Sequence, residues 1–396
     1  MRNLRAKKEP PSSPFSPGPL SVYVHVPFCR SRCGYCAFYS GEPLDRAPAF
    51  PGQVVREVGL RQGAWAGPVV TVYLGGGTPC LLGPDGIGRI LEAVDRAWGL
   101  DPGAEVTVEV NPGAGADLAG LAAAGVSRIS VGVQSLDDRV LGRLGRTHTA
   151  REALGCVDRA VRFGFRGVSV DLLLGLPGIA PGEPAAWARD LTAAGADHVS
   201  AYSLEVHPDT PLARLVEEGV WQPAPDHEEE AQWARLVDAL EAEGLLEYEV
   251  SNFARPGAEC RHNRVYWEGG AYVGLGPGAH GYDPGAGPWG ERRWNDPDLA
   301  AYARAVDAGR PPPGGVERPD RAQALMERLF LWLRRPLPWD PPAWKGLGLT
   351  RADIEAHAGP LVDAGLLHGD LRPTRAGRRR ADGLALWLWE RLRPAA

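Results

Sequence analysis

The segment FCRSRCGYC contains Cys29, Cys33 and Cys36, which are three of the six cysteines in the chain. Cysteine thiolates bind zinc ions and iron–sulfur clusters. A structural zinc ion takes four ligands, usually as two spaced pairs, whereas a single triplet stands here. Three thiolates would hold three irons of a [4Fe–4S] cluster and leave the fourth iron open to another ligand. The C-x3-C-x2-C spacing therefore favours an iron–sulfur cluster with an open iron over zinc.

The elements that must position these cysteines are short apolar strands separated by amphipathic helices. Their near-continuous apolar character is typical of a parallel sheet covered by helices. Six such units predict an α/β fold, a partial (β/α)6 TIM-like barrel that is two units short of the usual eight. The expected strands are Ser21–Val26, Val69–Leu74, Glu105–Val110, Ser127–Val133, Gly167–Leu174 and His198–Leu204.

Polar or glycine-rich motifs lie at the ends of four consecutive predicted strands. The carboxyl ends of parallel barrel strands meet at one mouth, so these motifs are expected to form one site with the cysteines. Taken singly, each is also explained by a tight turn or a buried hydrogen-bond network. Arg146, in LGRTHT, could grip a carboxylate, or form a surface salt bridge. The motifs are LGGGTPC with Gly76, Gly77 and Thr78, VEVNPG with Glu109, VGVQSLD with Gln134 and VDLLLGLPG with Asp171.

The cysteine spacing, with an aromatic residue before the last cysteine, resembles the radical S-adenosylmethionine (SAM) superfamily. Cys29, Cys33, Tyr35 and Cys36 match its motif. The resemblance implies that SAM chelates the open iron of a [4Fe–4S] cluster. It also implies cleavage of SAM to methionine and a 5′-deoxyadenosyl radical, with the cofactor carrying the difficult step.

The chain further resembles the oxygen-independent coproporphyrinogen III oxidase-like family, from about Ser21 to the C-terminus. The matching stretches are YVHVPFC, YLGGGTP, VEVNP, RISVGVQS, GRTH and DLLLGLPG. The resemblance implies that residues from these stretches surround SAM. They are Tyr23, Tyr35, Gly76, Gly77, Thr78, Glu109, Gln134, Arg146 and Asp171.

Two functions occur in that family. The coproporphyrinogen III dehydrogenase, which converts propionates to vinyls with SAM, has a further cysteine where Phe38 stands and a longer segment before the motif than the roughly 20 residues here. The HemW-type heme chaperone branch lacks that cysteine and carries H-N-x-x-Y-W. Chaperone function is therefore expected, with dehydrogenase activity as the alternative, and whether the chain is an enzyme is left open.

The stretch HNRVYW matches the chaperone motif, which implies contact with heme as cargo. An imidazole can ligate iron, and aromatic rings can stack on a porphyrin. A packed, hydrogen-bonded histidine is an equally good interpretation. The residues concerned are His262, Asn263, Tyr266 and Trp267.

Composition limits the partners. The formal net charge of -6 disfavours nucleic acid, and no run reaches the ~18 apolar residues of a membrane span. The basic stretch Arg375–Arg380 would be the wing of a DNA-binding regulator, although a solvated wing is the simpler interpretation. Few, scattered cysteines outside the triplet favour the cytoplasm. The resemblance implies a heme or porphyrinogen ligand, an electron donor and a heme-acceptor protein, including acceptors at a membrane.

Four regions are expected along the chain. They are a disordered tail (1–20), the radical SAM barrel core (21–205), an α+β extension with the HNRVYW segment (206–315) and a winged-helix-like helical domain (316–396). In the extension, LEYEVSNF predicts one strand. The proline run GRPPPGG is expected to be a linker.

Overall fold

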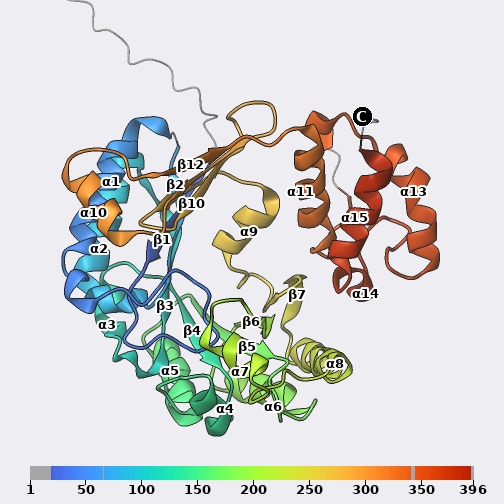
Figure 1. Ribbon diagram of the computed structural model, residues 1–396, viewed down its shortest axis with the longest axis horizontal. Helices are drawn as coiled ribbons and strands as arrows, with labels where there is room; N and C mark the ends of the chain where they lie inside the picture. Colours follow the sequence, from blue (N-terminus) through green and yellow to red (C-terminus); the bar gives the residue numbers. More distant parts are fainter. Residues whose placement is uncertain (1–18, 66, 340–343, 394–396) are drawn as a thin grey trace, which may run out of the picture.

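The computed structural model describes residues 19–65, 67–339 and 344–393, and within these ranges one curved sheet of twelve strands forms the centre. Helices cover the outer side of the curve (Figure 1). Residues 1–18 of the expected tail lie outside the described residues, and Leu20 already belongs to the first strand. The fold is α/β, and the sheet is not closed.

Six parallel strands in chain order form the barrel part of the sheet, which confirms the predicted α/β core. Most of them are rich in Val, Ile or Leu, as expected for parallel strands whose outer face is covered by helices. Their ends differ from the predicted ends by a few residues. The strands are β1 (Leu20–Val26), β2 (Val69–Gly76), β3 (Leu100–Val110), β4 (Arg128–Gln134), β5 (Gly167–Leu174) and β6 (His198–Ser203).

Helices connect these strands along the outer side. The side chain of Thr149 caps α5 and Glu152 completes a capping box, which satisfies two free amides of the first turn. No helix of the described residues is long and apolar enough to cross a bilayer. The connecting helices are α1 (Phe50–Arg61), α2 (Gly83–Trp98), α3 (Leu118–Ala123), α4 (Asp138–Arg143), α5 (Ala150–Arg162) and α6 (Glu183–Ala193).

The following segment extends the sheet at both edges. β8 pairs antiparallel with β6, and β9 pairs parallel with β1. The elements are α7 (Pro211–Glu217), α8 (Asp226–Ala242), β7 (Leu246–Glu249), β8 (Asn252–Ala254), α9 (Arg261–Glu268), β9 (Tyr272–Leu275), β10 (His280–Asp283), β11 (Glu291–Asn295), α10 (Leu299–Asp307) and β12 (Gly314–Glu317).

The single strand predicted for LEYEVSNF is wrong, because the chain turns back and forms the β7–β8 hairpin. The Glu249 carboxylate explains the turn, since it accepts hydrogen bonds from the Ser251 amide at 3.2 Å and from the Asn252 side chain. The expected linker GRPPPGG is shorter than predicted, because its last two residues, Gly314 and Gly315, belong to β12, which pairs with β11. Across the sheet, neighbouring strands follow the order β12, β11, β10, β9, β1, β2, β3, β4, β5, β6, β8 and β7.

Residues 321–392, here called the C-terminal region, pack around a core of their own that includes Leu329, Trp332 and Leu388. At the position of the expected wing, a single β-bridge joins Leu367 and Pro373. The helices are α11 (Arg321–Leu333), α13 (Arg351–Asp363), α14 (Arg375–Arg378) and α15 (Ala381–Leu392).

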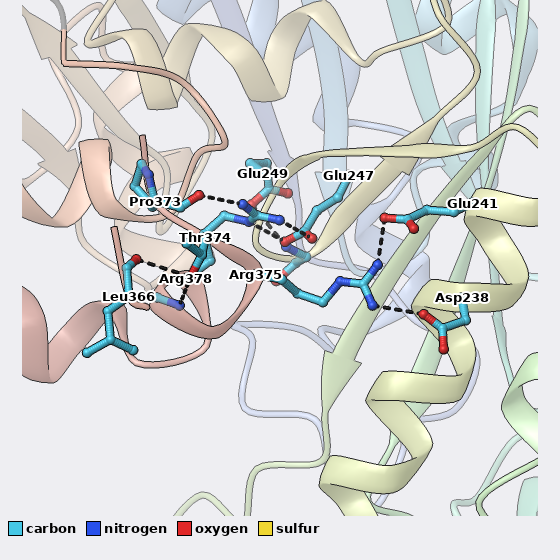
Figure 2. Close-up of polar contacts among 11 residues, drawn as sticks. Asp238, Glu241, Glu247, Glu249, Leu366, Pro373, Thr374, Arg375 and Arg378 are labelled. Carbon is cyan, nitrogen blue, oxygen red and sulfur yellow. Dashed lines mark hydrogen bonds and ion pairs between the residues drawn. The ribbon is translucent and has the colours of Figure 1, made fainter. Parts of the chain in front are cut away.

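The C-terminal region contacts both ends of the open sheet. At one end, Arg292 of β11 forms an ion pair with Glu327 of α11 at 2.6 Å. At the other end, Arg378 of α14 donates to both carboxylate oxygens of Glu247 of β7, as Figure 2 shows. The second pair is buried, with side chains 9% and 3% exposed. The region therefore bridges the gap that the missing strands leave.

Other basic residues of the expected wing also face the rest of the chain. Arg375 pairs with Asp238 and Glu241 of α8, both at 2.8 Å (Figure 2). The Arg379 guanidinium lies 3.7 Å from the centre of the Trp233 ring, and burial lowers its pKa. The basic stretch thus attaches the C-terminal region to α8 and β7 rather than projecting into solvent.

Substitution of Arg378 by Met should loosen this attachment. Removing one member of a buried ion pair leaves the Glu247 carboxylate without its partner, at a cost of about 3 kcal/mol. Hydrogen exchange of α14 and β7 should accelerate accordingly. Arg372→Met is the matched control, because Arg372 is exposed and lies 3.8 Å from Asp370. Equal exchange in the two variants would contradict the bridging role of Arg378.

Candidate functional site

A cavity of about 640 Å³ lies inside the curve of the sheet. Side chains from the cysteine loop and from strands β2 to β6 line it. This size is typical of a pocket for one small-molecule ligand. Of the site residues expected from the sequence, those that line the cavity are Cys29, Cys33, Tyr35, Cys36, Gly76, Gly77, Glu109, Gln134, Arg146, Asp171 and Asn263.

The cysteine triplet lies at this cavity, and all three thiols are free. The described residues contain no group of His, Cys, Asp or Glu side chains arranged around a single metal ion. A cubane cluster has a different requirement, because each thiolate binds a different iron and the sulfurs need not meet at one point. The donor set of three thiols on one wall fits such a cluster. Thr78 Oγ1 donates to Cys29 Sγ over 3.5 Å, Arg146 Nη1 donates to Cys33 Sγ over 3.4 Å, and Ser40 Oγ lies 3.8 Å from Cys36 Sγ.

The glycine run after β2 allows the cysteine loop to approach the strand. The amides of Gly77 and Thr78 donate to the carbonyls of Val26 and Phe28 at 2.8 and 2.7 Å. A Cβ atom on Gly77 would lie 2.5 Å from the Phe28 oxygen, so no larger residue fits. These two amides are therefore used to fix the loop.

The carboxyl groups of Glu109 in β3 and Asp171 in β5 both line the cavity. Glu109 accepts hydrogen bonds from the Tyr73 hydroxyl at 2.9 Å and the Gly76 amide at 3.1 Å. Burial raises the pKa of Glu109 to about 7, and the nearby Asp171 carboxylate adds to the rise. Burial also raises the pKa of Asp171 to about 6, against hydrogen bonds from Ser200 and Ser130 that lower it. The pair can accept hydrogen bonds from the hydroxyl or ammonium groups of a ligand.

Arg146 connects the cysteine loop to the sheet. Its Nη2 donates to the Asn111 side chain at 2.6 Å and to the Gly132 carbonyl at 2.5 Å, while Nη1 reaches Cys33. Its Nε is buried and has no hydrogen-bond partner among the described residues. The arginine therefore places a positive charge beside one of the thiols and ties the cysteine loop to the sheet.

Three other expected site residues have distinct positions. Gln134 lines the cavity with a φ of 70°, an unusual left-handed conformation for a residue other than glycine. Thr78 is buried behind Cys29 and accepts a hydrogen bond from Asn111 at 2.8 Å. Tyr23 lies outside the lining, with its hydroxyl 3.0 Å from His25 Nδ1. Tyr23 and Thr78 are therefore not part of the cavity lining.

The HNRVYW segment forms α9 on the inner side of the sheet (Figure 1). His262 is buried, and its Nδ1 lies 2.7 Å from Thr71 Oγ1 while its Nε2 lies 2.8 Å from the Tyr266 hydroxyl. Glu105 accepts the backbone amides of Arg261 and His262 and so fixes the start of the helix. In this conformation both imidazole nitrogens of His262 are occupied, so iron ligation would require one of them to lose its partner.

The remaining residues of the segment diverge. Asn263 lines the large cavity. Trp267 instead lines a separate cavity of about 100 Å³, together with Trp332 and Trp344 of the C-terminal region. The four residues expected to contact heme are thus not gathered on one face.

Part of the cavity lining was not expected from the sequence. Alternate residues of the strands point inward, because strand side chains alternate between faces. The signal was available as polar residues two positions apart within apolar strands, such as Ser169 before Asp171 and Ser200 before Tyr202. The lining residues not expected from the sequence include Tyr73, Thr107, Asn111, Arg128, Ser130, Ser169, His198, Ser200, Tyr202 and His207.

Comparison with known proteins identifies relatives of the whole chain. Residues 23–191 match the family described as the Radical SAM superfamily. The heme chaperone HemW of Mycobacterium tuberculosis is 39% identical, over 95% of this chain and 96% of that protein. HemW of Synechocystis is 34% identical over 80% of this chain and 78% of that protein. The solved structure of coproporphyrinogen III oxidase (HemN) from Escherichia coli has the same fold, with a TM-score of 0.78, 22% identity and coverage of 95% and 90%.

Lowering the pH should destabilise the folded chain, because the buried imidazole of His262 stays neutral there. Burial lowers its pKa from 6.5 to about 3, so the unfolded chain takes up a proton near pH 6.5 and the native chain does not. The free energy of unfolding should therefore fall as the pH drops from about 6.5 towards 3, by up to about 1.4 kcal/mol per pH unit from this group. His262→Gln should show a shallower decline in urea unfolding, while His227→Gln, at an exposed position, should match the unsubstituted chain. Identical slopes for all three would refute the buried neutral state.

Proposed function

This chain belongs to the radical SAM superfamily, in the HemW-type branch of the coproporphyrinogen III oxidase-like family, and we propose that it is a heme chaperone. In this proposal it carries a [4Fe–4S] cluster on Cys29, Cys33 and Cys36, binds SAM, and delivers heme to an acceptor protein. We further propose that it acts in the cytoplasm and receives electrons from a donor protein.

Family membership implies a [4Fe–4S] cluster and SAM. When bound, the cluster supplies an iron that SAM can chelate and an electron for its cleavage. The proposed thiolate ligands are supported by their common position on one wall of the cavity. Glu109 and Asp171 would accept hydrogen bonds from polar groups of SAM, and Gln134 would face the same ligand. Arg146 would hold the cysteine loop and compensate the charge of Cys33.

The observation that carries the heme chaperone proposal is the similarity to HemW proteins over nearly the whole chain. Phe38 supports it from the site itself. Its side chain is 68% exposed at the cavity, where the resemblance led us to expect a cysteine in a dehydrogenase. A phenyl ring there offers no thiolate and leaves an apolar surface beside the cysteine loop.

Removal of one proposed ligand should abolish the cluster. Anaerobic reconstitution of the unsubstituted chain should give a brown protein with about four irons. Cys33→Ala should lose the iron and the associated visible absorption, because two thiolates and a water do not replace three thiolates. Cys156→Ala is the control, since this buried cysteine lies in α5 away from the cavity. Full iron loading of Cys33→Ala would disprove the ligand assignment.

Heme binding and porphyrinogen oxidation can be separated in one paired experiment. Heme is titrated into the reconstituted protein and its Soret band is followed. In parallel, coproporphyrinogen III, SAM and a reductant are supplied and vinyl products are measured. The proposal expects saturable heme binding and no vinyl product. Conversion to protoporphyrinogen would show that the protein is a dehydrogenase instead.

A further inference from the structure

The rim of the large cavity carries side chains to which the sequence motifs assigned no binding role. Phe38 and Arg32 come from the cysteine loop, while Tyr202 and His207 come from the end of β6 and the segment after it. Phe38 is 68% exposed, whereas Tyr202, 43% exposed, points its hydroxyl inward towards Ser200 and Asp171. Large exposed apolar side chains beside a cavity are typical of a binding surface. The rim therefore combines rings, a cation and an imidazole at one opening.

His207 differs from the other histidines that could meet a ligand. All nine histidines lie within the described residues, and two of them, His198 and His207, line the cavity. Both ring nitrogens of His198 are occupied, by Ser169 at 2.6 Å and Tyr248 at 2.8 Å. The side chain of His207 is 46% exposed and has an ion-pair contact through Nε2 alone. Its Nδ1 has no hydrogen-bond partner in the part of the chain that the structure describes.

Within the described residues, the side chain of His207 keeps one ring nitrogen available for a metal ion. Its Nε2 lies 3.3 Å from a carboxylate oxygen of Glu205. The carboxylate lies beside Nε2 and leaves Nδ1 as the nitrogen that can ligate iron. His262 lacks this arrangement, because hydroxyl groups occupy both of its nitrogens.

The volume of the cavity also favours a rim site. A pocket of about 640 Å³ has the size for one small-molecule ligand. Binding of the larger, flat ligand at the rim leaves the interior, with Glu109 and Asp171, to SAM. Arg32 is exposed, and one of its Nη groups donates to the Cys36 carbonyl at 3.2 Å. Its other donors can pair with a carboxylate.

We propose that the heme cargo binds at this rim, with His207 as the ligand of its iron. Phe38 contacts the porphyrin, and Arg32 pairs with a propionate. This inference rests on the proposed heme chaperone function and names the site at which that function would operate.

The test is a heme titration of the reconstituted full-length protein, comparing the unsubstituted chain with His207→Ala and His227→Ala. Loss of the iron ligand should weaken heme binding at least about tenfold and remove the imidazole-ligated Soret band. Added imidazole should restore that band in His207→Ala by occupying the vacated position. The exposed control His227→Ala, in α8, should bind heme like the unsubstituted chain.

The outcomes separate the two proposals. If the unsubstituted chain binds no heme, the heme chaperone function itself fails, and the rim site with it. If the unsubstituted chain and His207→Ala bind heme with the same affinity and spectrum, the function stands and His207 is not the ligand. Equal weakening in His207→Ala and His227→Ala would also overturn the assignment. Thermal melting of each variant confirms that the exposed substitutions leave the fold intact.

Discussion

The close approach of the cysteine loop to the end of β2 is the constraint on which the site depends. Two backbone hydrogen bonds hold the loop, and they form only because Gly77 has no Cβ to collide with Phe28. Thr78, the next residue, then lies against Cys29. The position of the thiols is thus set by main-chain contacts of the parallel sheet, and the side chains around them refine it.

The open sheet leaves the interior walled by strands on one side only. Six parallel strands supply an interior with inward polar side chains, as in a barrel. The missing strands leave the wall incomplete, and the C-terminal region bridges the two sheet ends through ion pairs instead of backbone hydrogen bonds. One side of the interior is therefore built from hydrogen-bonded strands. The other side is closed by the C-terminal region, which side-chain ion pairs hold to the sheet.

Local patterns in the sequence predicted much of this structure. The six strands follow from apolar runs, the cysteine triplet from its spacing, Glu109 from its place at a strand end and Asp171 from its place as a polar residue inside an apolar strand. The pattern could not predict the surroundings of His262, because its partner Thr71 is 191 positions away in the sequence. Nor could it predict the β7–β8 turn, which depends on the Glu249 side chain, or the accessibility of His207. Each of these depends on contacts between elements that periodicity does not encode.

The two attachments of the C-terminal region differ in how strongly water and salt reach them. The Arg378–Glu247 pair is shielded, whereas Arg292 and Glu327 are 29% and 32% exposed and are screened by electrolyte. Rising ionic strength therefore weakens the exposed attachment before the shielded one. Because only three residues separate β12 from α11, the chain itself keeps that end in place when the ion pair is screened.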